Sequence, residues 1–236
     1  MYLRKKSLVV FSFFIFLIAS YVVAENGQDV SKLLDGHNVT VQGGMEGNSL
    51  NFISIGLDSD ADGLGDIVMV FFDKNYQILN YYKGQRTSSV ALIDYNDKFV
   101  VFRINTGKGD RGIVAYNIKK NKFDEYQIPY AWMYNLYVKG SLAFFSSEMG
   151  HPHLNYIDLK KKIMFSFEDI DCECAEFGVY KNKVYACSPT KGLVYRFTGK
   201  GFVKEEKVDK TKIQTSCHVM DDFKIDEGIL DRLGIR

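Results

Sequence analysis

The sequence lacks the short motifs by which common catalytic centres are recognised. It contains no G-x-S-x-G nucleophile elbow, no H-E-x-x-H metal pair and no G-x-x-x-x-G-K-[ST] phosphate loop. Carboxylates such as Glu148, Glu168 and Asp169 could form an acid–base pair only if the fold brought them together. We therefore expect a protein that is not an enzyme, and keep a secreted glycosidase-like hydrolase as an alternative.

A second long apolar run is also lacking, and the one that is present lies at the N-terminus. A basic segment, residues 4–6, precedes this run, and Val22 and Ala24 form the small-residue pattern of a cleavage site. We predict a signal peptide over residues 1–24 and a secreted or periplasmic mature chain that starts at Glu25 and has no membrane span. The alternative is a membrane anchor, because the run approaches the ~20 residues that span a bilayer.

Neither sign of charge is in excess. The chain has 30 basic and 29 acidic residues, and removal of the three basic residues of the signal peptide would leave 27 and 29, a net charge of −2. This balance is not the basic footprint of a nucleic-acid-binding protein. Residues 25–236 suit a single domain with a sizeable core.

Proline is scarce and helical periodicity is absent until the last dozen residues, whereas aromatic residues are abundant. The chain has three prolines, 18 phenylalanines and 15 tyrosines. Aromatic residues are enriched in strands, so the composition predicts an all-β protein that ends in a short helix near "DEGILDRLG".

An internal repeat runs through the middle of the chain. The segments that begin at residues 95, 138 and 180 each show a polar turn, an apolar strand, a loop, a strand with a central tyrosine, a short basic turn and a final strand. Four strands in every ~40–45 residues are typical of β-propeller blades. We predict a β-propeller-like fold of about four four-stranded units, with a β-sandwich as the alternative. The units are expected near residues 38–83, 88–129, 132–170 and 174–208, and residues 209–236 would add a partial unit or a closing strand.

The most informative loop is "DSDADGLGD", which begins at residue 58. Aspartates occupy its first, third, fifth and ninth positions, and four carboxylates this close repel one another unless a positive charge lies among them. Calcium prefers such oxygen ligands, and a glycine at the sixth position permits the sharp turn. We predict a calcium site in which the backbone carbonyl of the seventh residue also takes part; its residues are Asp58, Asp60, Asp62, Leu64 and Asp66, with Gly63 at the turn. A solvated acidic turn is the alternative.

This loop is not an EF-hand, because position twelve is Met69 and no helices are expected beside it. The arrangement D-x-D-x-D-G-x-x-D between two strands instead resembles the calcium loops of FG-GAP/VCBS-type repeats. That resemblance covers residues 56–72 and implies a calcium-binding β-propeller repeat of the kind found in integrin-like propellers and in many secreted bacterial proteins. This chain has one such loop, whereas that family usually repeats it.

Four cysteines form an even set: Cys172, Cys174, Cys187 and Cys217. In an exported chain we expect disulfides, and four cysteines allow three pairings. The turn expected at "YKNK" would bring Cys174 and Cys187 onto adjacent strands and leave Cys172 for Cys217. Pairing of Cys172 with Cys174 is disfavoured, because residues two apart on one strand are separated by ~6.6 Å.

An alternative for these residues is a metal site that joins "CEC", "HPH" and "CH" as soft ligands, although the spacings match no standard zinc pattern. We expect His151 and His153 to lie on a loop between strands. The leading interpretation is a calcium-stabilised β-repeat protein that binds a protein or a glycan through its loops, and does not bind nucleic acid. A periplasmic inhibitor or immunity protein that caps a toxic enzyme is a second possibility.

Overall fold

The computed structural model describes residues 30–47, 50–58, 65–106, 111–128, 132–148, 152–168, 175–215, 218–219, 223–226 and 228–235. The predicted signal peptide lies outside these residues. No helix in the described part is long and apolar enough to cross a membrane.

The described chain is built almost entirely of antiparallel strands, which confirms the all-β prediction. The first seven strands are β1 (Val39–Glu46), β2 (Asn51–Leu57), β3 (Gly65–Phe72), β4 (Ile78–Tyr95), β5 (Phe99–Thr106), β6 (Arg111–Asn117) and β7 (Lys122–Ile128). The next eight are β8 (Trp132–Lys139), β9 (Leu142–Glu148), β10 (Pro152–Asp158), β11 (Ile163–Phe167), β12 (Glu176–Tyr180), β13 (Lys183–Cys187), β14 (Val194–Phe197) and β15 (Phe202–Lys204). The smaller elements are α1 (Val30–Leu34), the 3-10 turn η1 (Lys210–Lys212), β16 (Gln214–Thr215), β17 (His218–Val219) and α2 (Ile229–Arg232).

These strands form four antiparallel sheets of four or five strands, which we number as units 1 to 4. Unit 1 contains β1, β2, β3 and the first half of β4, which pairs with β3 from Ile78 to Thr87. Unit 2 contains the second half of β4, which pairs with β5 from Thr87 to Tyr95, followed by β5, β6 and β7, with β17 added beside β4. Unit 3 is β8 to β11, and unit 4 is β12 to β15 with β16 added beside β12.

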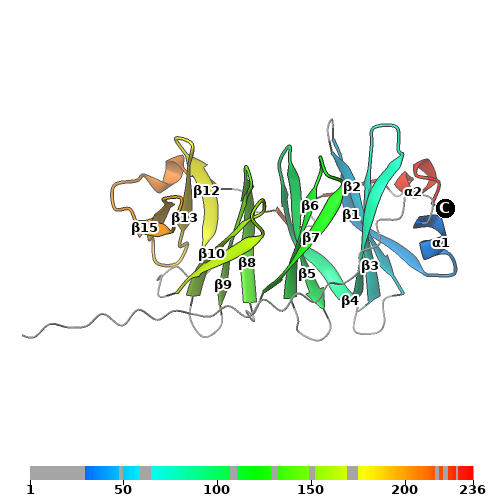
Figure 1. Cartoon of the computed structure of the whole chain (residues 1–236), viewed down its shortest axis with the longest axis horizontal. Coiled ribbons are helices and arrows are strands. Elements are labelled where there is room, and N and C mark those ends of the chain that lie inside the picture. The colour runs from blue at the N-terminus through cyan, green and yellow to red at the C-terminus, as the bar shows by residue number, and fades with distance from the viewer. Residues whose placement is uncertain are drawn as a thin grey trace, which may run out of the picture.

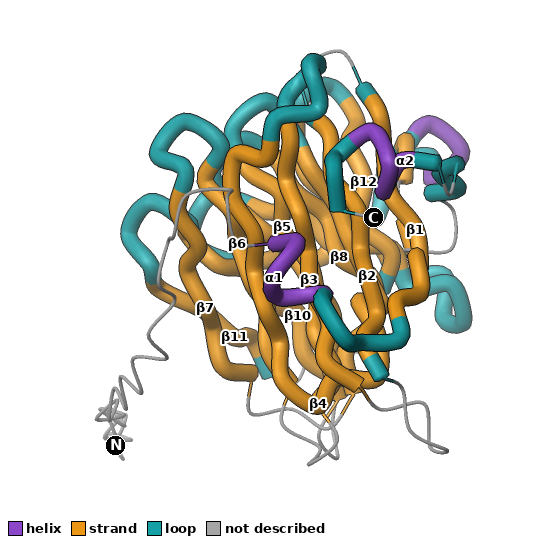
Figure 2. The backbone as a smooth tube through the Cα atoms, turned by 90° about the vertical axis from the view of Figure 1, so that its right-hand side faces the viewer, coloured by secondary structure: helices purple, strands orange, loops and turns teal. Residues whose placement is uncertain are grey.

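The units stand side by side in a row along the long axis of the molecule (Figure 1). A view along that row shows the sheets stacked one behind another (Figure 2). Apolar side chains from facing sheets fill the three gaps between neighbouring units. Every residue of β2 is buried, since both faces of its sheet are covered. Four stacked sheets therefore replace the two packed sheets of the β-sandwich alternative.

The two end faces of the row are covered by other parts of the chain. Apolar residues of α1 and α2 pack on the free face of unit 1, including Val30, Ile229 and Leu230. At the opposite end, Val208 and Ile213 pack on the free face of unit 4. Such covers remove from water the apolar surface that a missing neighbour would otherwise bury. Helix α1, with only five residues, was not predicted from the sequence.

The C-terminal segment runs back along the first strands of the units. It pairs with β12 of unit 4 through β16 and with β4 of unit 2 through β17. The amide of Gly44 in β1 then donates to the carbonyl of Phe223 at 2.9 Å, and α2 follows on unit 1. The segment thus connects the two ends of the row.

Candidate functional site

Strand pairing at the start of unit 1 positions the first aspartate of the acidic loop. Val39 and Leu57 are register partners in β1 and β2, so Asn38 and Asp58 lie beside each other. The amide of Asn38 donates to Asp58 Oδ1 at 2.7 Å, and His37 Nδ1 hydrogen-bonds to Asp58 Oδ2. These hydrogen bonds, the one from His37 first, lower the pKa of the Asp58 carboxyl.

The last aspartate of the loop has a cationic partner. Asp66 lies at the start of β3, and its Oδ2 is 3.0 Å from the ammonium nitrogen of Lys83 in β4. Both side chains are about one-third exposed, at 33% and 32%. Asp60, Asp62 and Leu64, the remaining ligands predicted from the sequence, lie outside the described residues.

The charge balance of the loop is therefore only partly explained by the described residues. Two of the four aspartates are held by His37, Asn38 and Lys83, and carboxylates are the oxygen donors that a hard cation such as calcium selects. The donor chemistry fits calcium, whose binding would compete with these internal partners. Within the described ranges, no three His, Cys, Asp or Glu side chains are grouped as a metal site.

The cysteines are described only in part. Cys187 is buried at the end of β13, and burial raises the pKa of its thiol. The other three cysteines lie outside the described residues, so the disulfides stay a prediction. The register of the β12–β13 hairpin places Glu176 opposite Cys187.

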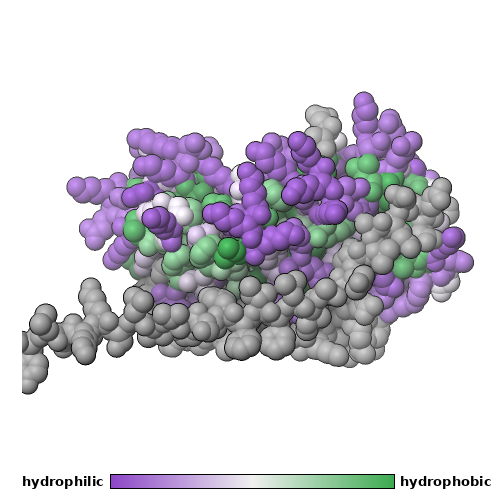
Figure 3. All heavy atoms as spheres, in the orientation of Figure 1, coloured by the Kyte–Doolittle hydropathy of each residue, from purple (hydrophilic) through white to green (hydrophobic). Residues whose placement is uncertain are grey.

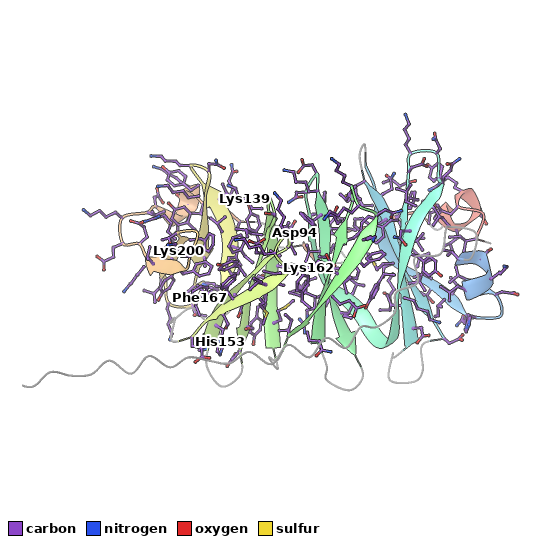
Figure 4. All side chains as sticks on the ribbon, viewed as in Figure 1. Asp94, Lys139, His153, Lys162, Phe167 and Lys200 are labelled. Carbon is purple, nitrogen blue, oxygen red and sulfur yellow. The ribbon has the colours of Figure 1, made fainter. Side chains whose placement is uncertain are left out.

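One histidine expectation is wrong. His153 does not lie on a loop but inside β10, where it is 6% exposed and its Nδ1 is 3.3 Å from Ser166 Oγ (Figure 4). His153 lies in a strand because β10 begins earlier than expected, at Pro152. Pro152 and His153 pair with Glu148 and Ser147 of β9. His151 lies outside the described residues.

Buried polar side chains in unit 3 were not recognised from the sequence. Asn155 is completely buried and donates to Ser147 Oγ at 2.8 Å, while its Oδ1 has no hydrogen-bond partner in the described structure. Glu148 accepts a hydrogen bond of 3.2 Å from the Tyr134 hydroxyl. The signal was available as polar residues at strand positions in "FFSSE" and "HLNYID", because buried polar groups need partners.

The structure places two of the three carboxylates that were considered above as an acid–base pair. Glu148 ends β9 and Glu168 follows β11, and β10 lies between these two strands. Their backbones are therefore separated by about two strand spacings, ~9.5 Å. Asp169 lies outside the described residues.

A hollow of ≈ 580 Å³ lies beside α1. Ser31, Asp35 and His37 all line it, but no hydrogen bond joins these three side chains in the described part of the chain. His37 is bonded to Asp58, so the hollow does not assemble the nucleophile–base contact of a serine hydrolase.

Comparisons with known proteins give no family. The chain matches no known protein family and no curated protein sequence. Among solved structures, it is similar to the computationally designed Ika4 protein, with a TM-score of 0.41 and 14% identity over 69% of this chain and 93% of that one. It is also similar to the acylaminoacyl peptidase of Pyrococcus horikoshii, with a TM-score of 0.45 and 8% identity over 78% of this chain and 34% of that one.

Proposed function

We propose that this chain is an exported, calcium-stabilised β-repeat protein that acts as a binding module for a protein or a glycan. In this proposal the four units are propeller-like blades arranged in an open row, and residues 58–66 form a calcium loop of the FG-GAP/VCBS type. The calcium ion has a structural role, holding β2 and β3 in place at the edge of unit 1.

The observation that carries the binding proposal is the continuity of one edge of the row. In each sheet the turn between the first two strands and the turn between the last two lie at the same edge. Polar contacts join neighbouring units at or beside these turns: Asn80 Nδ2 of β4 donates to the Asn121 carbonyl at 2.9 Å, Asn96 Nδ2 to the Gly140 carbonyl at 3.1 Å, and Lys139 Nζ to the Asn182 carbonyl at 3.0 Å. Turns carried on a rigid scaffold are common recognition surfaces.

Calcium binding is tested by substitution within the loop. Asp60→Asn with Asp62→Asn is the suitable pair, because Asp58 and Asp66 also make contacts inside the protein. Calcium at ten times its Kd should stabilise the unsubstituted protein by about 1.4 kcal/mol and the double variant by nothing measurable. The matched control is Asp97→Asn with Asp231→Asn, two exposed aspartates outside the loop. Calorimetric titration without saturable binding up to about 10 mM, beyond the weak extracellular range, would exclude the site.

The binding role is tested by capture. The exported protein, immobilised with calcium and again with chelator, should retain a defined protein or glycan from its native compartment, and retention should fall in chelator. A protein retained together with its inhibited hydrolytic activity would indicate the inhibitor alternative. Turnover in a hydrolase screen would indicate an enzyme and contradict the proposal.

A further inference from the structure

The edge of the row that carries the turns is densely basic, although the whole chain is nearly neutral. Twelve lysines and three aspartates lie in the seven described turns of this edge, a difference of nine positive charges. We call this surface the lysine edge; its turns are residues 73–77, 96–98, 118–122, 139–141, 158–162, 180–183 and 198–201. Eleven of the lysines are exposed, and Lys139 is half-buried.

Two of the aspartates are occupied in forming the turns. Asp73 Oδ1 accepts from the backbone amides of Asn75 and Gln77 at 2.8 and 2.9 Å. Asp158 Oδ1 accepts from the amides of Lys160 and Lys161, each at 3.1 Å. By contrast, only three of the twelve ammonium groups form an ion pair in the described structure, those of Lys98, Lys161 and Lys162. Most of the positive charge therefore faces solvent, and the visible upper surface is strongly hydrophilic (Figure 3).

Two lysines occupy backbone positions that do not favour lysine. Lys162 has φ 59° and Lys181 has φ 46°. Asn121, with φ 50°, occupies the position equivalent to Lys162 in unit 2, and Gly140, with φ 61°, occupies the position equivalent to Lys181 in unit 3. Glycine and asparagine adopt this left-handed conformation at lower cost. Strain at an observed position supports a functional hypothesis. Five non-glycine residues of this surface have positive φ, and lysine stands at two of these positions; the others are Tyr76, Asn121 and Asn182.

We propose that the lysine edge binds a linear acidic polysaccharide. This inference specifies the chemistry of the partner and rests on the binding role proposed above. The charge is spread along the row and not gathered in one pocket, which suits a polymer with repeated anionic groups. All of the basic residues in these turns are lysines, and an ammonium is a point charge without the planar fork by which arginine reads single phosphates or base edges. The two tyrosines in the turns, Tyr76 and Tyr180, are only half-exposed, so they offer poor platforms for stacking bases.

The test uses the mature protein and dextran sulfate, with uncharged dextran as the control polymer. Dextran sulfate should bind and dextran should not. Binding should weaken at least tenfold between 0.1 M and 1 M salt, where the Debye length falls from about 10 Å to about 3 Å. Absence of binding to dextran sulfate, or equal binding to dextran, would overturn the inference.

Two sets of variants locate the binding surface. The substitutions Lys119→Gln, Lys120→Gln and Lys160→Gln should weaken binding at least tenfold. Their matched control makes the same change of net charge outside the lysine edge, at Lys207, Lys210 and Lys224, and should bind within twofold of the unsubstituted protein. Equal losses in both sets would show a response to net charge alone and would overturn the inference.

A further substitution keeps the fold and removes the strain. Lys181→Asn should leave the melting temperature unchanged or higher but weaken the binding of dextran sulfate, and unchanged binding would contradict the role of this lysine. Lys162 is left in place because its ammonium pairs with Asp124 of unit 2. Tighter binding to phosphatidylserine vesicles or to duplex DNA than to dextran sulfate would overturn the choice of partner. If dextran sulfate fails to bind while a calcium-dependent partner is captured, only this inference is wrong and the proposed function stands.

Discussion

The ion pair between Lys83 and Asp66 makes a specific prediction about calcium. If calcium binds the acidic loop, the Lys83 ammonium competes with it for the Asp66 carboxylate, which lies 3.0 Å away. Both side chains are about one-third exposed, so the pair contributes between 0 and about 1 kcal/mol. Replacing Lys83 by Met should therefore lower the calcium-free stability by at most ~1 kcal/mol, a fall of about 2–4 °C in melting temperature.

The same substitution should raise the affinity for calcium. Removal of a competing pair of up to ~1 kcal/mol corresponds to at most about a fivefold lower Kd, since 1.4 kcal/mol is tenfold. The assay is calorimetric titration of calcium, combined with thermal melts in chelator and in calcium. Lys83→Arg, which keeps the charge, and Lys74→Met, which removes an exposed lysine at the opposite edge, are the controls. Calcium affinity that is lower in Lys83→Met would refute the reasoning, because the loss of a competing cation cannot weaken calcium binding.

Three other predictions concern the edges and ends of the row. Leu230→Ala should destabilise the protein by about 2–5 kcal/mol, because this residue of α2 is 2% exposed and packs on the free face of unit 1. Hydrogen exchange should then show protection lost in β1–β3 before it is lost in unit 4. Uniform loss of protection would contradict a local role for α2. Asp94→Asn should lower the free energy of unfolding, measured by chemical denaturation, by about 1–3 kcal/mol. Asp94 is 6% exposed and its two oxygens accept from the amides of Tyr95 and Val138, whereas an asparagine side chain has only one acceptor oxygen. A change below about 0.5 kcal/mol would show that the hydrogen bond to Val138 of unit 3 is dispensable. The pKa of Asp58 is lowered below the ordinary 3.8, so its stabilising contribution is present above pH 3.8 and is lost as the pH falls through the lowered value. Carbonyl NMR should show the titration midpoint of Asp58 rise toward 3.8 in the variant His37→Ala. An unmoved midpoint would disprove the role of His37.

Local sequence patterns predicted the strands well because each strand is defined by its own residues and turns. The all-β class follows from alternating apolar and aromatic runs between Gly-, Asn- and Lys-containing turns, a signal that depends on neighbours in the chain. The boundary between units 1 and 2, expected between residues 83 and 88, lies inside a strand, since β4 continues without a break from Ile78 to Tyr95. Register shifts near Thr87 allow this single strand to leave one sheet and enter the next. Such a change of partner is a property of pairing, and no residue type marks it.

The segments that cover the two ends of the row show a second limit of prediction from the sequence. Helix α1 has five residues and its partner α2 has four, too few for a helical period to be recognised. Their stability comes from the exposed apolar face of unit 1, which the sequence of the helices does not contain. The return path of the C-terminal segment depends in the same way on free strand edges in units 2 and 4.

The acidic loop has a signal that is local in the sequence and partners that only the fold brings to it. Together they change the effect on stability that we expect from substitutions in the loop. The spacing of its aspartates is local, so a cation site could be predicted from the sequence alone. Its internal partners, His37 and Lys83, lie 21 and 17 residues away along the chain and reach the loop only through strand pairing. From the sequence, replacement of Asp58 and Asp62 together by alanine relieves repulsion and should not destabilise the calcium-free protein. For Asp58 alone we expect the opposite sign, because Asp58 accepts hydrogen bonds from His37 and Asn38 that an alanine could not replace. Loss of stability in calcium-free Asp58→Ala would therefore report these hydrogen bonds and not the absence of calcium.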